Sequence, residues 1–253
     1  MNVLLLAAGY GTRLRPLTDS VPKELLPVGG KPIIDWILDA VRATPGIGSV
    51  HIVTNSPKAE AVGAWAAEHD VVVHDDGTST NDDRLGATGD IRFVLDRTDL
   101  RNDDLLVIAG DNIFGFDLAT YIAFWRERGG SAVAVHQLAD PSLASLYGVV
   151  ELDPEGRIER FEEKPEHPRT DLVSTATYIF GRPHIALLDR YLDDGNPPDP
   201  PGRFLTWLAE REPVYGYSFR EEWLDIGDAT QLFEADRRFR DRLGLEPITE
   251  YSL

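Results

Sequence analysis

A glycine-rich turn follows the first apolar run of the chain and ends on an arginine. The run Val3–Ala7 is followed by Gly9 and Gly11, then by Thr12 and Arg13. Glycines at such a turn let backbone N–H groups approach a phosphate closely, and a guanidinium behind them can hold phosphate oxygens with two hydrogen bonds. The turn lacks the third glycine of a Rossmann fingerprint and the Gly-Lys-Ser/Thr ending of a Walker loop. The pattern indicates phosphate binding, although a tight structural turn explains the glycines alone equally well.

A lysine in a proline-stiffened loop follows this turn. Lys23 lies within Pro22–Val28, close enough to Arg13 along the chain for both to reach the same phosphates. The chain has only four lysines, Lys23, Lys31, Lys58 and Lys164. A compact ammonium retained among many arginines is a hint of function. Codon bias or a salt-adapted surface is the plainer explanation of the scarcity.

Two carboxylates stand at turns that end apolar runs. Asp111 follows the run Leu105–Ala109 within Gly110-Asp111-Asn112, and Asp225 lies in the apolar segment Trp223–Gly227. Mg²⁺ favours few protein carboxylates together with substrate phosphates, so the pair is suited to a magnesium site. The alternative is ordinary turn chemistry, which Gly-Asp-Asn also serves well.

A second charged motif combines a carboxylate and an ammonium. Tyr147–Val150 is followed by Phe161–Pro165, which contains Glu163 and Lys164. Such a pair suits a polyhydroxylated phosphate, because the carboxylate can accept hydrogen bonds from hydroxyls while the ammonium binds the phosphate. A solvated charge run at the end of a strand is the alternative.

The elements that must position these residues alternate along the first half of the chain. Apolar periodicity predicts strands at 3–7, 50–54, 71–73 and 105–109 and helices at 33–42, 59–68 and 87–97, with a loop at 75–83. This order predicts a parallel sheet with helices on both faces and functional loops at the carboxyl ends of its strands. The second half predicts a hairpin at 149–152 and 157–161, a strand at 172–180, a loop at 195–202, helices at 203–211 and 229–242, and a short strand or turn at 223–227.

The overall composition restricts the classes of molecule that the protein can bind. A net charge of −18 argues against a nucleic-acid surface, and an anionic substrate would need locally concentrated positive charge. The chain has no cysteine, so disulfides are excluded. No apolar stretch is long enough to span a membrane, and the first residues lack the basic region of a signal peptide. We therefore expect a cytoplasmic protein that binds neither nucleic acid nor membrane.

Taken in order, the motifs resemble the sugar-phosphate nucleotidyltransferase family, and within it the glucose-1-phosphate thymidylyltransferases most closely. The likeness is carried by Leu6–Thr18, Pro22–Val28, Lys31–Pro32, Gly110–Asn112, Tyr147–Val150, Glu162–Pro165 and Trp223–Gly227. The resemblance implies an α/β fold with a Rossmann-like, doubly wound mixed sheet. It further implies a single domain, 1–253, in which 1–112 mainly binds the nucleotide and 113–253, including a smaller lobe, mainly binds the sugar phosphate.

The resemblance also implies the reaction and its residues. The partners would be a nucleoside triphosphate and a sugar 1-phosphate, the cofactor Mg²⁺, and the products an NDP-sugar and pyrophosphate. Arg13 and Lys23 would be catalytic, and Asp111 and Asp225 would bind the metal. The nucleotide would contact Leu6, Ala8, Gly9, Gly11, Thr12, Asp75 and Gly86, and the sugar phosphate would contact Gly148, Glu163, Lys164, Thr175 and Tyr178.

Three departures from the family pattern affect the substrate. The glutamine that usually faces the base is missing from 73–77, Ala176 replaces a glycine before the sugar-site tyrosine, and Pro201–Phe204 replaces an Arg-Gly-Glu element. With His74 or Asp75 in place of the glutamine, we expect dTTP or UTP. A guanylyl- or cytidylyltransferase acting on a non-glucose sugar or cyclitol phosphate, and a catalytically inactive sensor of sugar nucleotides, stay open, as does the oligomeric state.

Overall fold

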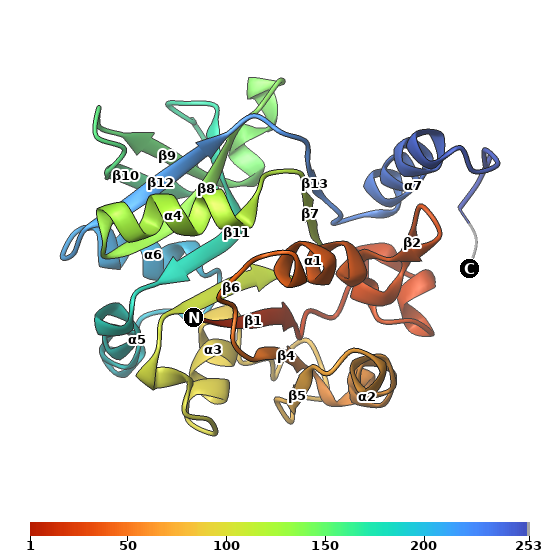
Figure 1. Cartoon of the computed structure of the whole chain (residues 1–253), viewed down its shortest axis with the longest axis horizontal. Helices are drawn as coiled ribbons and strands as arrows, with labels where there is room; N and C mark the ends of the chain where they lie inside the picture. The colour runs from red at the N-terminus through yellow and green to blue at the C-terminus, as the bar shows by residue number, and fades with distance from the viewer. Residues whose placement is uncertain (252–253) are drawn as a thin grey trace.

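The computed structural model describes residues 1–251 and contains a nine-stranded mixed sheet with helices on both faces (Figure 1). The strand order is β10-β9-β11-β6-β1-β4-β5. In addition, β8 pairs with β11, and β12 pairs with β8. The strands are β1 (Asn2–Ala7), β4 (Val50–Thr54), β5 (Val72–Asp75), β6 (Leu105–Ala109), β8 (Ser131–Gln137), β9 (Gly148–Leu152), β10 (Ile158–Glu163), β11 (Leu172–Phe180) and β12 (Val214–Phe219). The α/β class and the mixed sheet are thereby confirmed.

The helices and the two small ribbons complete the architecture. The helices are α1 (Ile33–Arg42), α2 (Ala59–Glu68), α3 (Ala87–Leu95), α4 (Leu118–Arg128), α5 (Arg182–Asp193), α6 (Gly202–Ala209) and α7 (Ala229–Leu243). The ribbons pair β2 (Pro27–Val28) with β3 (Lys31–Pro32), and β7 (Asn112–Phe114) with β13 (Trp223–Asp225). Among the described residues no helix has the length and apolar character needed to cross a membrane.

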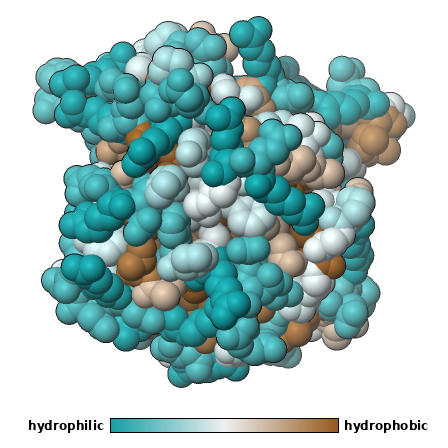
Figure 2. All heavy atoms as spheres, turned by 60° about the vertical axis from the view of Figure 1, so that its left-hand side comes forward, coloured by the Kyte–Doolittle hydropathy of each residue, from teal (hydrophilic) through white to brown (hydrophobic). Residues whose placement is uncertain are grey.

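Alternation along the central strands produces a core on each face of the sheet. Val3 and Leu5 of β1 pack into the cluster formed with α1, α2 and α4, whereas Leu4 between them packs into the cluster formed with α3, α5 and α6. Successive side chains of a strand point to opposite faces, so a fully apolar strand fills both cores. Figure 1 shows α1 and α4 lying across one of these faces. The face drawn in Figure 2 is mainly hydrophilic, with hydrophobic residues in small separate groups.

Strand β1 lies where the order of strand addition reverses: β4 and β5 are added on one side of it, and β6 is added on the other. It pairs in parallel with β4 on one side and with β6 on the other. The connection through α1 crosses one face, and the connection through α3 crosses the opposite face. Loops at the carboxyl ends of β1 and β6 therefore diverge, and in open α/β sheets this divergence creates the ligand crevice.

The second half of the chain extends the same sheet with antiparallel strands. β11 pairs with β6 and with β8, and its register shifts between Ser174 and Tyr178. At this irregularity Ala176 has φ = 53°, a left-handed conformation that glycine adopts more easily. Ala176 stands where the family resemblance leads us to expect glycine, and glycine would adopt this φ with less strain.

Several predicted bounds need correction. The third strand runs over 72–75 rather than 71–73, because its pairing with β4 continues to Asp75. The helix expected at 203–211 begins one residue earlier and ends at Ala209, and α3 ends at Leu95 rather than at 97. The division of the chain at residue 112 remains a prediction, and β6 and β11 on either side of it belong to one sheet.

Candidate active site

The glycine-rich turn leaves the carboxyl end of β1 with its backbone donors unused. Gly11 has φ = 61° and precedes the 3₁₀ turn Thr12–Leu14. A Cβ at Gly11 would lie 3.0 Å from Cγ2 of Thr18, whose hydroxyl donates to the Gly11 carbonyl at 2.9 Å. The N–H groups of Gly9, Tyr10 and Gly11 have no acceptor within residues 1–251. Consecutive unpaired N–H groups at a strand end are suited to an anion.

Beside this turn, residues from three distant segments form a charged cluster. The Lys23 ammonium makes an ion pair with Oδ2 of Asp111. Asn112 donates to Oδ1 of Asp111 at 2.7 Å and to Oδ1 of Asp225 at 3.4 Å, and it accepts from the Trp223 indole at 2.7 Å. Asp225 lies opposite Asn112 because β7 and β13 pair in antiparallel register. The structure thus brings Lys23, Asp111 and Asp225 together.

Burial and charge act differently on the two carboxylates. Burial raises the pKa of Asp225 to about 6, and the negative charge of Asp111 adds to the rise. Burial acts in the same direction on Asp111, but the Lys23 ammonium and the Asn112 amide donor together outweigh it and hold the pKa of Asp111 below its ordinary value. Two half-buried carboxylates that share one neighbouring ammonium carry excess negative charge, and a divalent cation would neutralise it.

The donor set fits a hard cation that takes few protein ligands. No group of three or more Asp, Glu, His or Cys side chains in the described part of the chain has the arrangement of a complete metal site. Asp111 and Asp225 would supply two oxygens, leaving the other positions to water and phosphate oxygens, as Mg²⁺ commonly accepts.

Arg13 lies beside Gly227, two residues after Asp225. A Cβ at Gly227 would be 3.1 Å from Nη2 of Arg13, so the absence of a side chain at residue 227 leaves room for the guanidinium. The positive charge of Arg13 acts to lower the pKa of Asp225 and of Tyr147. Arg13 and Lys23 therefore provide the local positive charge that an acidic protein needs to hold an anion.

The second charged motif lies where β9, β10 and α6 meet. A Cβ at Gly148 would lie 3.1 Å from the Glu163 carboxylate, and a Cβ at Gly202 would lie 2.1 Å from it. The absence of side chains at these two glycines therefore makes room for the carboxylate. Burial raises the pKa of Glu163, while Lys164 acts to lower it. Glu163 also lines a cavity of about 860 Å³ together with Arg203 and other residues of α6 and the loop after β10.

The other two side chains predicted to contact the sugar, Thr175 and Tyr178, make contacts within the protein. The Thr175 hydroxyl donates to the Ala134 carbonyl of β8 at 3.0 Å. The Tyr178 ring is buried and stacks on Phe180, and burial raises the pKa of its hydroxyl, with the charge of Glu163 adding to the effect. Tyr178 is thus a neighbour of Glu163, and roles for Thr175 and Tyr178 in sugar binding remain predictions.

The loop expected to face the base is tied to the glycine-rich turn. The Tyr10 hydroxyl contacts the Thr78 hydroxyl at 3.0 Å, and Thr78 donates to Asp76 at 2.7 Å. Gly86 has φ = 77° and starts α3, and a Cβ there would lie 2.7 Å from Cβ of Asp199. The loop from β5 to α3 is therefore held against both the turn and residues 198–199.

The two side chains suggested as substitutes for the missing glutamine are engaged elsewhere. The His74 ring lies 2.9 Å from the His51 ring, nitrogen to nitrogen, and burial together with His51 lowers the pKa of His74 to about 4. Asp75 accepts from the Ser56 hydroxyl at 2.7 Å and from the Gly77 N–H at 2.9 Å. Leu6 and Ala8 do lie at the carboxyl end of β1, beside the turn.

Sequence patterns did not identify several polar residues at this site. Asp76 and Asp90 are buried, and Asp76 Oδ2 and Asp90 Oδ1 have no hydrogen-bond partner in the described structure. Glu24 and Lys58 are buried beneath the turn. The only signals in the sequence were the position of Glu24 next to Lys23 and the scarcity of lysine.

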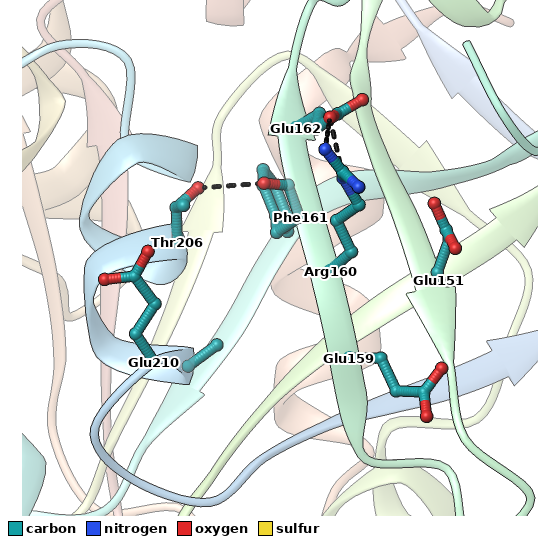
Figure 3. A pocket seen from close by; sticks show the side chains of 8 residues that line it. Glu151, Glu159, Arg160, Phe161, Glu162, Thr206 and Glu210 are labelled. Atoms are coloured by element: carbon teal, nitrogen blue, oxygen red, sulfur yellow. Dashed lines mark hydrogen bonds and ion pairs between the residues drawn. The ribbon is translucent and has the colours of Figure 1, made fainter.

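A cavity of about 570 Å³ between β9, β10 and α6 has a different character (Figure 3). Glu151, Glu159, Glu162 and Glu210 line it, and Arg160 pairs with Glu162 at 2.7 Å. An acidic lining of this kind repels anionic substrates. The carboxyl ends of β1 and β6, where Lys23 and Asp111 lie beside the glycine-rich turn, are therefore the candidate active site.

Comparison with known proteins identifies relatives along almost the whole chain. The family model described as Nucleotidyl transferase matches residues 2–242. The chain is 30% identical to a UTP–glucose-1-phosphate uridylyltransferase of Synechocystis sp., covering 94% of this chain and 63% of the relative. It is 32% identical to a mannose-1-phosphate guanylyltransferase of Mycobacterium tuberculosis, covering 90% and 61% respectively. It is 33% identical to a glucose-1-phosphate thymidylyltransferase of Streptomyces antibioticus, covering 99% and 68% respectively.

A solved structure supports the fold. A UDP-glucose pyrophosphorylase complexed with UDP-glucose superposes with a TM-score of 0.80 at 22% identity, covering 95% of this chain and 98% of that chain. The chain spans about three fifths of the length of the first two relatives named above.

Proposed function

Because the chain belongs to the nucleotidyl transferase family, we propose that it transfers a nucleotidyl group from a nucleoside triphosphate to a sugar 1-phosphate and releases pyrophosphate. The observation that carries the proposal is the cluster of Lys23, Asp111 and Asp225 beside a turn whose N–H groups of Gly9, Tyr10 and Gly11 are unpaired in the described structure. Cations, carboxylates and backbone donors in one crevice are what the transfer of a charged phosphorus group requires.

The reaction we propose is an in-line displacement. An oxygen of the sugar phosphate forms a bond to the α-phosphorus of the triphosphate. The bond from that phosphorus to the oxygen bridging the α- and β-phosphates breaks, and the electron pair leaves with pyrophosphate. No general base is needed, since a sugar phosphate is already ionised at neutral pH. Catalysis then rests on orientation and on neutralisation of charge.

The chain's own residues divide these tasks. The turn from Gly9 to Gly11 would donate N–H groups to the phosphates, and Arg13 and Lys23 would neutralise the triphosphate and the leaving pyrophosphate. Glu163 would accept hydrogen bonds from sugar hydroxyls, and Lys164 would bind the phosphate of the acceptor. The charge of Lys164 acts on the pKa of Asp225, which supports an ammonium close to the reacting groups.

Asp111 and Asp225 would hold Mg²⁺. When bound, the ion would supply charge stabilisation to the phosphate oxygens. Without the cation, the Lys23 ammonium compensates the charge of Asp111 and holds its pKa low, so this half-buried carboxylate stays ionised and able to bind a cation.

For the base we propose thymine or uracil, in that order. A carboxylate only accepts hydrogen bonds while ionised, and this suits the ring N3–H of thymine or uracil and opposes the acceptor N3 of cytosine. The engagement of His74 with His51 removes one of the two substitutes for glutamine that the sequence suggested. The hydrogen bonds that Asp75 accepts from Ser56 and Gly77 both end on its Oδ1. Asp75, through Oδ2, and the backbone of Gly86 therefore remain as the proposed partners of the base.

A pyrophosphate-release assay tests the proposal. The purified protein with Mg²⁺ is given dTTP, UTP, CTP, GTP or ATP, each with glucose 1-phosphate and then with other sugar 1-phosphates. We expect release that depends on the sugar phosphate, with the highest kcat/KM for dTTP and UTP. A preference for GTP would refute the proposed base and leave the proposed reaction standing. No release with any pair would favour the inactive sensor.

A further inference from the structure

A buried lysine and a buried glutamate lie directly beneath the glycine-rich turn. The Lys58 side chain, which follows β4, is 8% exposed, and the Glu24 side chain is 4% exposed. Lys58 Nζ lies 3.6 Å from Glu24 Oε2. Burying two charges costs free energy that their attraction does not fully return, so such a pair is not explained by stability alone.

The ammonium has a second contact, with the turn itself. Lys58 Nζ donates to the Gly9 carbonyl, and Asn55 Nδ2 donates to the Ala8 carbonyl at 2.8 Å. In a trans peptide the N–H points away from the preceding carbonyl. Holding the carbonyls of Ala8 and Gly9 inward therefore directs the N–H groups of Gly9 and Tyr10 away from the protein, and neither has an acceptor in the described structure.

Glu24 joins the other two motifs of the site. It follows Lys23 in the chain, and a Cβ at Gly110 would lie only 2.9 Å from its Cγ. The residue after Gly110 is Asp111, the partner of Lys23. Glu24 Oε2 has no hydrogen-bond partner within residues 1–251, and its charge is compensated mainly by Lys58 and to a smaller extent by Lys23.

We propose that the Lys58–Glu24 pair is a positioning element. It fixes the peptide planes of the glycine-rich turn with their N–H groups toward the triphosphate and links that turn to the Lys23–Asp111 segment. The inference rests on the proposed function, since the ligand of these N–H groups is taken to be a polyphosphate. Lys58 and Glu24 touch no substrate in this scheme and act through Gly9 and Lys23.

Substitution of Lys58 tests the first part. Lys58→Met keeps the aliphatic stem and removes the donor to Gly9, so the KM for the triphosphate should rise roughly 10- to 150-fold. The KM for the sugar phosphate should change less than about 2-fold, because that subsite is formed by other elements. Lys58→Arg, which keeps a donor, should recover part of the loss. Lys31→Met is the matched control, because the Lys31 ammonium pairs with Asp39 of α1, away from the turn.

A double variant separates positioning from stability. Lys58→Met alone removes the larger of the two positive charges that act on the buried Glu24, so it should also lower the melting temperature. In Glu24→Gln/Lys58→Met both charges are gone, and stability should recover. The KM for the triphosphate should stay raised, because the Gly9 carbonyl still lacks its donor. If that KM recovers together with stability, the pair is structural only and the inference is overturned.

Calorimetric binding of inorganic tripolyphosphate gives a readout that does not depend on turnover or on the base. Wild-type protein should bind it, and Lys58→Met should bind it roughly 10-fold or more weakly. Equal binding by both overturns this inference and leaves the proposed function standing. Wild-type protein that binds neither tripolyphosphate nor any of the triphosphates overturns both.

Discussion

The glycine at the start of α6 offers a way to move one side chain of the proposed sugar subsite without replacing it. A Cβ at Gly202 would lie 2.1 Å from Oε2 of Glu163 and 2.7 Å from Cε1 of Phe161. Both distances are far inside van der Waals contact. Gly202→Ala must therefore displace the Glu163 carboxylate and shift the Phe161 ring.

The size of the effect follows from the interaction that is lost. A hydrogen bond to a charged group is worth roughly 1.5–3 kcal/mol, which corresponds to a KM for the sugar phosphate raised roughly 10- to 150-fold. Crowding the Phe161 ring should cost about 1–3 kcal/mol of stability. In a protein of this size each kcal/mol lowers the melting temperature by about 2–4 °C. The variant should therefore fold, with a melting temperature several degrees below that of the wild-type protein.

Steady-state kinetics with each substrate varied in turn gives the answer. The KM for the triphosphate should stay close to the wild-type value, since the glycine-rich turn belongs to another part of the crevice. Gly63→Ala in α2 is the control, because nothing lies within 4 Å of the added Cβ. A folded Gly202→Ala variant with an unchanged KM for the sugar phosphate would refute a role for Glu163 in sugar binding. An equal rise for both substrates would show a general disturbance instead.

Three further predictions follow from the site and its surroundings. Asp111→Asn and Asp225→Asn should each lower kcat by roughly 100-fold or more with Mg²⁺ present; a variant that stays folded by circular dichroism and keeps near-native turnover would refute that residue as a metal ligand. Lys164→Ala should raise the KM for the sugar phosphate roughly 10- to 150-fold with little change for the triphosphate, and no change would place Lys164 outside the sugar subsite. Burial, with the charge of Asp76, raises the pKa of Asp90 to about 8, whereas the unfolded chain titrates near 4. The folded state then holds the extra proton, so the free energy of unfolding should fall by about 1.4 kcal/mol per pH unit as the pH rises through that window. In urea titrations at about pH 5 and about pH 7, the free energy of unfolding should fall more steeply in wild-type protein than in Asp90→Asn by this amount, because the other groups that titrate in this window, such as Asp225, contribute equally to both; equal slopes in both would contradict the assignment.

The parts of the fold that were predicted are those set by local periodicity. The helices at 33–42 and 59–68 and the strands at 105–109 and 172–180 have the predicted bounds. Each carries its own apolar pattern and is bounded by turn residues. No assignment was made for α4, β8, α5 or β12. The place of β12 beside β8 depends on a pairing between segments distant in sequence, which periodicity does not reveal.

In the site, too, some features follow from local sequence patterns and others depend on tertiary contacts. Asp111 lies near the glycine-rich turn because it follows β6, which pairs in parallel with β1 and so ends at the same edge of the sheet. Asp225 reaches it through the antiparallel pairing of β7 with β13, and the ion pair of Lys23 with Asp111 is not a prediction of the sequence analysis. Pairing of buried charges such as Lys58 with Glu24 is a tertiary property, since either residue alone resembles a surface residue in the sequence.

Isotope labelling tests the central claim most directly, because it distinguishes transfer of a nucleotidyl group from transfer of a phosphoryl group. The purified protein is incubated with Mg²⁺, a sugar 1-phosphate and a triphosphate labelled at either the α- or the γ-phosphorus. The account predicts that the α label appears in the NDP-sugar and the γ label in pyrophosphate, in equal amounts and only when the sugar phosphate is present. A γ label in the sugar product, or α label released without a sugar phosphate, would contradict it.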